Sequence, residues 1–118
     1  MPQSLNDIQT RIYFLGIGGI GMSALARYFK QKGHPVAGYD KTPSVVTAAL
    51  IEEGIPVYYE QSIEHIDQAD LIIYTPAVKN DNIEFVYAQT GKNLFKRSEI
   101  LGWIVKSFDS IAVGGTHG

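Results

Sequence analysis

Six residues near the amino terminus, Gly16-Ile17-Gly18-Gly19-Ile20-Gly21, have the spacing G-x-G-x-x-G. They follow a short aromatic and aliphatic run and open a stretch with apolar residues at helical spacing, a context typical of nucleotide diphosphate binding. In such a turn Gly16 permits the tight bend, Gly18 lets the backbone approach the diphosphate, and Gly21 lets the helix pack on the strand. Unpaired helix N–H groups and the positive end of the helix dipole would then bind the phosphates.

Asp40 is the second residue that bears on this chemistry. It directly follows the apolar run at residues 36–39 and stands 19 residues after Gly21. At that position of a nucleotide-binding fold, an acidic side chain accepts hydrogen bonds from ribose hydroxyls. The alternative is that the glycines serve only a strand-to-helix turn and that Asp40 is a solvated carboxylate. The pattern favours a nucleotide diphosphate as ligand, although the spacing does not say which nucleotide.

Strand and helix patterns alternate along the chain, as in parallel sheets whose strands are joined by helices. Strands are expected at residues 11–17, 36–39, 57–59, 71–74, 94–95 and 111–113, and helices at 21–32, 44–53, 82–89 and 98–106. Gly33 and Gly54 stand where the first two helices would end, and Ser44 can cap the second. We therefore expect a single α/β domain with a Rossmann-like, doubly wound, mostly parallel sheet.

The composition excludes several other classes of function. The 118 residues contain no cysteine, which excludes disulfide scaffolds, thiolate metal sites and cysteine nucleophiles. Ten Lys and Arg stand against 12 Asp and Glu, a net charge of −2, so nucleic acid is not expected as a partner. No run approaches the roughly 18 apolar residues of a membrane span, and no signal peptide begins the chain, so we expect no membrane partner and a cytoplasmic location. No metal site is expected from the spacing of His, Asp and Glu, and His34 and His65 are expected to be solvated.

Several short motifs together are more specific than the glycine pattern alone. They are GIGGIGMS at residues 16–23, GYD at 38–40, TPAV at 75–78 with Asp81-Asn82 after it, FKRSE at 95–99, and GTHG at 115–118. In order and spacing they resemble the amino-terminal part of the Mur ligases, most of all the members that join L-alanine to UDP-N-acetylmuramate. The resemblance covers nearly the whole chain.

The resemblance implies a division of the chain. Residues 1–110 correspond to the Rossmann-like domain that holds the UDP-sugar, and residues 111–118 to the start of the central ATP-binding domain, with an incomplete P-loop. The full-length enzyme would use ATP and Mg²⁺ to phosphorylate the lactyl carboxylate of UDP-N-acetylmuramate, and the amino group of L-alanine would then displace phosphate. The chain stops before the P-loop lysine, so we expect it to be inactive by itself, with no catalytic residue and no required cofactor.

The same resemblance assigns residues to the ligands. The glycine-rich motif would hold the diphosphate, Asp40 and Thr42 the uridine, and residues 75–78 a second wall of the cleft. Arg97 would pair with a phosphate or carboxylate, the alternative being a surface ion pair with Glu99. The substrate residues are Gly16, Ile17, Gly18, Gly19, Ile20, Gly21, Met22, Ser23, Asp40, Thr42, Thr75, Ala77, Val78 and Arg97, and those of the partial ATP loop are Gly115, Thr116, His117 and Gly118.

Two departures from the family pattern fall at the expected cleft. Pro76 has no N–H, so its backbone cannot donate to a ligand. Tyr39 either stacks near the uracil or packs in the core.

Two other functions remain open. The glycine pattern and Asp40 alone would also support the NAD(P)-binding domain of an oxidoreductase. A nucleotide-sensing regulatory domain would show the same features.

Overall fold

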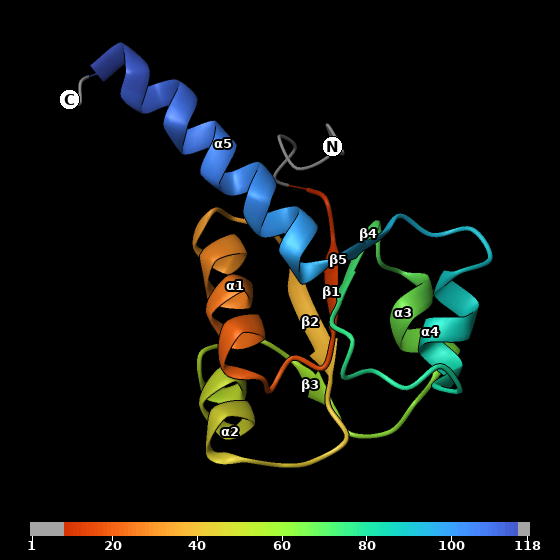
Figure 1. The fold of residues 1–118 in the computed structure, drawn as a ribbon. Helices are drawn as coiled ribbons and strands as arrows, with labels where there is room; N and C mark the ends of the chain where they lie inside the picture. The colour runs from red at the N-terminus through yellow and green to blue at the C-terminus, as the bar shows by residue number, and fades with distance from the viewer. Residues whose placement is uncertain (1–8, 116–118) are drawn as a thin grey trace.

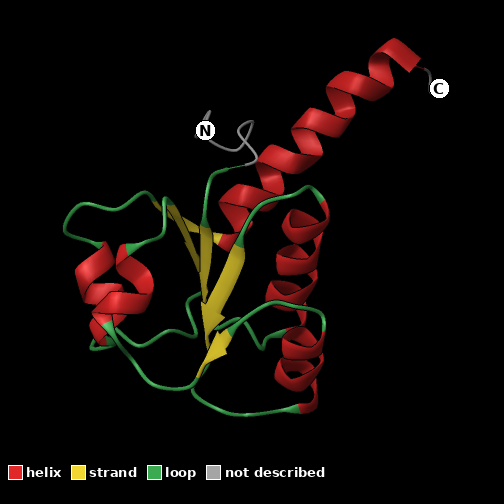
Figure 2. Cartoon of the chain, turned by 180° about the vertical axis from the view of Figure 1, so that it is seen from behind, coloured by secondary structure: helices red, strands yellow, loops and turns green. Residues whose placement is uncertain are grey.

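The computed structural model describes residues 9–115, and the side chains of residues 9–106. Its centre is a five-stranded sheet in the order β3-β2-β1-β4-β5, in which all neighbouring strands are parallel. The strands are β1 (Ile12–Leu15), β2 (Val36–Tyr39), β3 (Val57–Tyr58), β4 (Leu71–Tyr74) and β5 (Leu94–Lys96). Helices lie on both faces of the sheet (Figures 1 and 2), namely α1 (Ile20–Gln31), α2 (Val45–Glu52), α3 (Ile63–Asp67), α4 (Ile83–Ala88) and α5 (Arg97–Gly115). The predicted doubly wound α/β fold is therefore confirmed.

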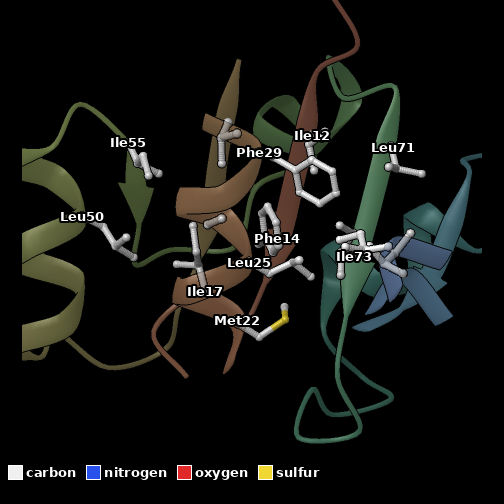
Figure 3. Close-up of a cluster of buried hydrophobic side chains, with 14 residues drawn as sticks. Ile12, Phe14, Ile17, Met22, Leu25, Phe29, Leu50, Ile55, Leu71 and Ile73 are labelled. Carbon is white, nitrogen blue, oxygen red and sulfur yellow. The ribbon is translucent and has the colours of Figure 1, made fainter. Parts of the chain in front are cut away.

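The central strands are buried on both faces, which explains their apolar sequences. All four residues of β1 are buried, and so are the first three of β4. Ile12 and Phe14 join a hydrophobic cluster with residues of α1, α2 and α5, whereas Tyr13 and Leu15 join a second cluster with residues of α3 and α4. Figure 3 shows the first cluster, in which side chains of α1 face those of β1 and β4. These apolar runs are therefore those of strands covered on both faces.

Local sequence features begin and end the helices that flank the sheet. Ser44 is the N-cap of α2, since its side chain accepts a hydrogen bond from Thr47 N–H (3.1 Å) and its own N–H donates to Thr47 Oγ1 (2.8 Å). Asn82 caps α4 by accepting from Phe85 N–H at 3.0 Å. Gly54 follows α2 with a φ of +91°, which is the left-handed conformation that favours glycine. The helices predicted at residues 44–53 and 82–89 are therefore confirmed, as α2 and α4.

The strand order places several loops at one edge of the sheet. β1 lies between β2 and β4, and the register aligns Leu15 with both Tyr39 and Tyr74, the last residues of those strands. The chain therefore leaves the sheet at the same level after each of the three strands. In open α/β sheets, ligands bind in the crevice at such a point.

The strand predicted at residues 111–113 is wrong. α5 runs without interruption from Arg97 to Gly115, and its second half extends away from the sheet (Figure 1). A strand satisfies its backbone N–H and C=O groups only through a neighbouring strand, whereas a helix satisfies them within itself. The short apolar run therefore continues the helix that Ile100 and Ile104 anchor in the first hydrophobic cluster.

Candidate functional site

A cavity of about 630 Å³ opens at the carboxyl ends of the central strands. Its lining combines the glycine-rich loop, the end of β2, the loop after β3, the loop after β4 and the start of α5. The lining residues are Gly16, Gly19, Gly21, Met22, Tyr39, Asp40, Lys41, Gln61, Thr75, Ala77, Val78, Lys79, Asp81, Asn82 and Arg97. The cavity therefore lies where the strand order predicts a ligand site.

The glycine-rich loop is held in shape by the protein itself. Gly16 has a φ of +91°, which an L side chain rarely adopts. Its N–H and that of Ile17 both donate to the carbonyl oxygen of Tyr39, at 2.8 and 3.0 Å, and Gly19 N–H donates to Gly16 O at 3.2 Å. Ile17 is fully buried in the first hydrophobic cluster. The Ile17 side chain thus anchors the loop and does not line the cavity.

The first turn of α1 presents hydrogen-bond donors to the cavity. Its N-cap is Gly19, which has no side chain to accept a hydrogen bond, and its first turn contains no acidic residue. The N–H groups of Ile20, Gly21 and Met22 precede the first intrahelical bond, which Ser23 N–H donates to Gly19 O at 2.8 Å. These donors and the positive end of a 12-residue helix favour an anion at this place.

Asp40 closes the opposite side of the glycine-rich loop. Its Oδ2 accepts a hydrogen bond from Gly18 N–H at 2.7 Å, and its Oδ1 accepts one from Thr42 N–H at 3.0 Å. A Cβ atom on Gly18 would lie 2.6 Å from Asp40 Oδ2 and 3.0 Å from Thr47 Cγ2, so only glycine permits this approach. Each carboxylate oxygen has a second lone pair, and Asp40 can therefore still accept a hydroxyl of a ligand.

Arg97, the first residue of α5, lies over the start of α1. A Cβ atom on Gly21 would be 2.8 Å from Arg97 Nη1 and 3.1 Å from Cζ, so the missing side chain of Gly21 makes room for the guanidinium. No ion pair with Arg97 occurs within the part of the chain whose side chains are described. The alternative pairing with Glu99 is not observed, since Glu99 Oε1 instead accepts from Lys96 N–H at 2.8 Å. The cation is therefore open to an anionic ligand.

The loop after β4 forms the facing wall. Thr75 Oγ1 and Val78 Cγ2 lie 3.8 Å from where a Cβ atom on Gly16 would be, so this loop contacts the glycine-rich loop. Val78 N–H donates to Thr75 O at 3.0 Å and closes a turn around Pro76. The loop then brings Lys79 and Asp81 to the cavity.

The structure gathers most, but not all, of the predicted substrate residues. Gly16, Gly19, Gly21, Met22, Asp40, Thr75, Ala77, Val78 and Arg97 line the cavity, whereas Ile17, Gly18, Ile20, Ser23 and Thr42 do not. Ser23 is buried with its hydroxyl on Ile20 O, and the Ile20 side chain is 85% exposed. Gly115 ends α5, and Thr116, His117 and Gly118 lie outside the described residues, so the partial ATP loop stays a prediction.

Six further residues line the cavity, and of these only Tyr39 was predicted, as one of two alternatives, to contact the ligand. They are Tyr39, Lys41, Gln61, Lys79, Asp81 and Asn82. Tyr39, Asp81 and Asn82 lie within the quoted motifs, so the sequence already marked their segments. Tyr39 is 7% exposed and belongs to the second hydrophobic cluster, so it serves the core as well as the cavity. No motif in the sequence marks Gln61 as a cavity residue, because its place in the lining depends on the order of the strands.

A buried carboxylate, Glu84, lies between α4 and the sheet. Glu84 is 0% exposed and accepts hydrogen bonds from Tyr13 Oη (3.0 Å) and from Ser62 N–H (2.8 Å). Burial raises the pKa of Glu84, although these hydrogen bonds and nearby His65 oppose the shift. Burial and the Glu84 charge also raise the pKa of Tyr13. The group ties α4 to β1 and to the start of α3.

The two internal histidines differ from the expectation that they are solvated. His34 is 4% exposed, and its Nδ1 lies 3.1 Å from Thr10 O. His65 is partly buried and stacks on Tyr58 with ring centroids 3.7 Å apart. Both side chains therefore have structural contacts, since His34 in the turn after α1 lies against the Thr10 backbone and His65 on α3 packs on Tyr58 of β3.

The described residues offer neither a cluster of metal ligands nor a helix that could span a membrane. No group of three or more His, Cys, Asp or Glu side chains there could hold a metal ion. None of the helices in the same part of the chain combines the length and apolar character needed to cross a bilayer.

Comparisons with known proteins agree on one family. Residues 11–109 match the family described as "Mur ligase family, catalytic domain". The chain is 48% identical to a UDP-N-acetylmuramate–L-alanine ligase of Phocaeicola vulgatus, over 95% of this chain and 26% of that protein. It is 50% identical to the enzyme of that name from Flavobacterium johnsoniae, over 98% and 27% respectively. The chain thus spans about a quarter of the length of the curated relatives it matches.

Solved structures give the same answer. A UDP-N-acetylmuramate-alanine ligase from Thermotoga maritima superposes with a TM-score of 0.79 at 36% identity, covering 84% of this chain and 23% of that one. A murein peptide ligase from Psychrobacter arcticus gives 0.65 at 27% identity, over 72% and 18%. Neither comparison supports the oxidoreductase or regulatory alternatives. With its parallel sheet, its glycine-rich loop and these relatives, the chain belongs to the Mur ligase family.

Proposed function

We propose that this chain is the amino-terminal, UDP-N-acetylmuramate-binding part of a UDP-N-acetylmuramate–L-alanine ligase. The observation that carries the proposal is the cavity in which the uncapped first turn of α1 and the unpaired Arg97 face the same space. Two phosphate groups fit such a place, because backbone donors, the helix dipole and a guanidinium all favour negative charge. That the diphosphate belongs to UDP-N-acetylmuramate is inferred from the names of the relatives.

The residues of the cavity then take separate roles. Gly21 and Met22, which line the cavity in the first turn of α1, donate backbone hydrogen bonds to the diphosphate, and Arg97 pairs with it. Asp40, at the end of β2, accepts from the ribose hydroxyls. The loop at residues 75–78 forms the opposite wall, where the side chain of Thr75 can hydrogen-bond the ligand and Pro76 cannot donate from its backbone. These groups bind and orient the substrate, and none of them reacts.

We also propose the reaction of the full-length ligase. A carboxylate oxygen of the lactyl group attacks the terminal phosphorus of ATP, ADP leaves, and the amino group of L-alanine then attacks the acyl carbon, releasing phosphate and a proton. ATP and Mg²⁺ would be held by the central, ATP-binding domain of the full-length enzyme. Residues 111–118 would be the start of that domain, and Gly115, Thr116, His117 and Gly118 would be the first part of its ATP loop. Residues 1–110 would form the UDP-sugar domain, and α5 spans the boundary between the two. The setting is the cytoplasm of a bacterium.

Calorimetric titration of the 118-residue chain tests the ligand. UDP-N-acetylmuramate and UDP should bind, while NAD and ATP should not. Binding of NAD without the uridine ligands would contradict the proposal and favour the oxidoreductase alternative. Binding of none of them would contradict the assignment of the cavity.

Arg97 offers a sharper test of the diphosphate site. Arg97→Gln removes a charge-assisted hydrogen bond and should weaken UDP binding by about 1.5 to 3 kcal/mol, measured by the same titration. Lys106→Gln is the matched control, because it removes an exposed cation from the same helix and should leave the affinity unchanged. Equal affinities in the two variants would show that Arg97 does not contact the ligand.

A further inference from the structure

The loop after β3 and the start of α4 are joined by two reciprocal hydrogen bonds. Ser62 N–H donates to Glu84 Oε2 at 2.8 Å, and Ile83 N–H donates to Gln61 Oε1 at 2.7 Å. Each segment thus supplies one backbone N–H and one accepting side chain to the other. We call this pair of hydrogen bonds the clasp.

The clasp joins two parts of the cavity lining that the sheet keeps apart. Its segments follow β3 and β4, which are separated by β2 and β1 in the strand order. In Figure 1 the loop after β3 runs along this edge of the sheet to α3, and α3 packs against α4. Gln61 and Asn82, one from each segment, line the cavity. The clasp therefore fixes the lining on the side of α3 and α4.

Glu84 provides the buried half of the clasp. Gln61 is exposed, so water can replace its hydrogen bond to Ile83 N–H, whereas Glu84 is 0% exposed. The second oxygen of Glu84 accepts from Tyr13 Oη at 3.0 Å, and Tyr13 lies in β1, the central strand of the sheet. The carboxylate thus fixes Ser62 relative to the core of the fold. Without it, Ser62 N–H would lose its acceptor, and the loop would have to move to find another.

We propose that Glu84 is a positioning residue of the nucleotide cavity. By holding Ser62, it keeps the loop after β3 in the place where the ligand meets it, and so raises the affinity for UDP. The inference rests on the proposed function, in which a uridine diphosphate occupies the cavity. Glu84 does not line the cavity and therefore acts through the loop. When the loop is held before the ligand arrives, binding does not have to restrict it, and less conformational entropy is lost.

Two substitutions of Glu84 separate its acceptor oxygens from its volume. Glu84→Met keeps a side chain of similar length but has no oxygen for Ser62 N–H, and it should weaken UDP binding about three- to ten-fold, as expected for the loss of one hydrogen bond. Glu84→Gln keeps an oxygen for Ser62, and its NH₂ group can donate to Tyr13 Oη, so it should restore the affinity of the original chain to within about two-fold. Calorimetric titration with UDP measures both affinities.

Ile66→Ala is the control for a purely structural effect. Ile66 is fully buried on α3 and does not line the cavity, so its truncation destabilises the fold without removing either hydrogen bond of the clasp. At a temperature where circular dichroism shows each variant to be folded, Ile66→Ala should bind UDP as tightly as the original chain does. Original affinity in Glu84→Met would overturn the inference. A loss in Glu84→Gln or Ile66→Ala as large as that in Glu84→Met would also overturn it, because the acceptor would then not be the cause.

Amide hydrogen exchange on the original chain gives a second test, which needs no substitution. Saturating UDP should slow exchange at Ser62 N–H by about the same three- to ten-fold factor, because the coupling between closing the clasp and binding the ligand is reciprocal. Lys92 N–H, which donates to Ala88 O beyond the other end of α4, should exchange at the same rate with and without UDP. Exchange at Ser62 that does not respond to UDP would overturn the inference even if Glu84→Met fails to fold.

These outcomes are distinct from failure of the proposed function. If the original chain binds UDP but neither the exchange at Ser62 nor the affinity of Glu84→Met changes, the positioning role is wrong and the uridine diphosphate site stands. If the original chain does not bind UDP, the proposed function fails, and the inference fails with it.

Discussion

At the residue scale, Gly18 shows how one missing side chain shapes the site. The pattern G-x-G-x-x-G predicts that this glycine admits a diphosphate, but in the structure the space beside it is taken by Asp40 and Thr47. Its N–H is also used, since it donates to Asp40 at 2.7 Å. Gly18 therefore acts by letting Asp40 hold the loop, and the donors open to a ligand come from the next turn.

Gly18→Ala should destabilise the chain. The added methyl group would lie 2.6 Å from Asp40 Oδ2, so the carboxylate or the loop must move, at a cost of about 1 to 3 kcal/mol in the free energy of unfolding. Denaturant unfolding measures the change. The control is Gly102→Ala within α5, where no atom lies within 4 Å of the new Cβ and where helix propensity predicts a gain of about 0.5 to 1 kcal/mol. A stable Gly18→Ala protein would show that Asp40 is not held in the observed position.

Glu84 should make stability depend on pH. Burial raises its pKa above the ordinary 4.5, so the folded chain holds the proton more tightly than the unfolded chain does. As the pH rises through 4.5 and above, the unfolded chain ionises first, and the free energy of unfolding falls over that window. Glu84→Gln cannot ionise and should gain stability relative to the original chain as the pH rises above 4.5.

Denaturant unfolding at several pH values checks this expectation. Glu52→Gln, at an exposed position of α2, is the control and should show no such pH-dependent gain. A stability difference between Glu84→Gln and the original chain that stays constant with pH would contradict the shifted pKa.

At the scale of elements, the helices α1 and α2 begin in opposite ways. Ser44 and Thr47 satisfy the first turn of α2 through a capping box, whereas Gly19 leaves the first turn of α1 without a side-chain cap. The side chains of α2 therefore satisfy the N–H groups of its own first turn, whereas the N–H groups in the first turn of α1 stay free at the cavity. α3 also begins without a side-chain cap, so the open first turn of α1 indicates a ligand only because it borders the cavity.

Gly19→Asp should abolish UDP binding and raise the free energy of unfolding. Gly19 has φ −66° and ψ 149°, which suit any residue, and a new Cβ would meet its nearest atom at 3.6 Å. The carboxylate would cap α1 and raise the free energy of unfolding by about 0.5 to 1 kcal/mol, while occupying the place of a phosphate and abolishing UDP binding. Gly19→Ala, which brings the methyl group but no acceptor, should keep UDP binding. UDP affinity retained by Gly19→Asp would place the phosphates elsewhere.

The sequence predicts the elements whose signals are local. β2 and β4 have the predicted bounds because continuous apolar runs mark strands covered on both faces. The strand at 111–113 could not be distinguished from a continuing helix, because a strand depends on a neighbour that local sequence does not reveal. The same limit applies to the cavity. The glycine-rich loop and Asp40 follow from spacing, whereas Gln61 reaches the cavity only through the position of β3 beside β2.

At the scale of the whole molecule, the site depends on the complete fold. Arg97 reaches Gly21 only because β5 is the edge strand beside β4 and α5 then lies on the same face as α1. Residues from Gly16 to Arg97 meet in one cavity, so an unfolded chain has no equivalent site. Ligand binding and global stability are therefore linked.

That linkage gives a measurable expectation for the original chain. UDP at about one hundred times its dissociation constant should raise the free energy of unfolding by about 2.7 kcal/mol. Denaturant unfolding with and without UDP measures the effect, and NAD at the same concentration should have none. A UDP effect much smaller than the measured affinity requires would mean that the nucleotide also binds the unfolded chain.

The internal hydrogen bonds of the glycine-rich loop have a kinetic consequence. Gly16, Ile17, Gly18 and Gly19 each donate their N–H to an acceptor within the chain, so the loop is ordered before a ligand arrives. Association then requires little further loss of conformational entropy in this segment. Encounter should accordingly proceed at a rate typical of preorganised sites, and differences in affinity among related nucleotides should arise mainly from how long each one stays bound.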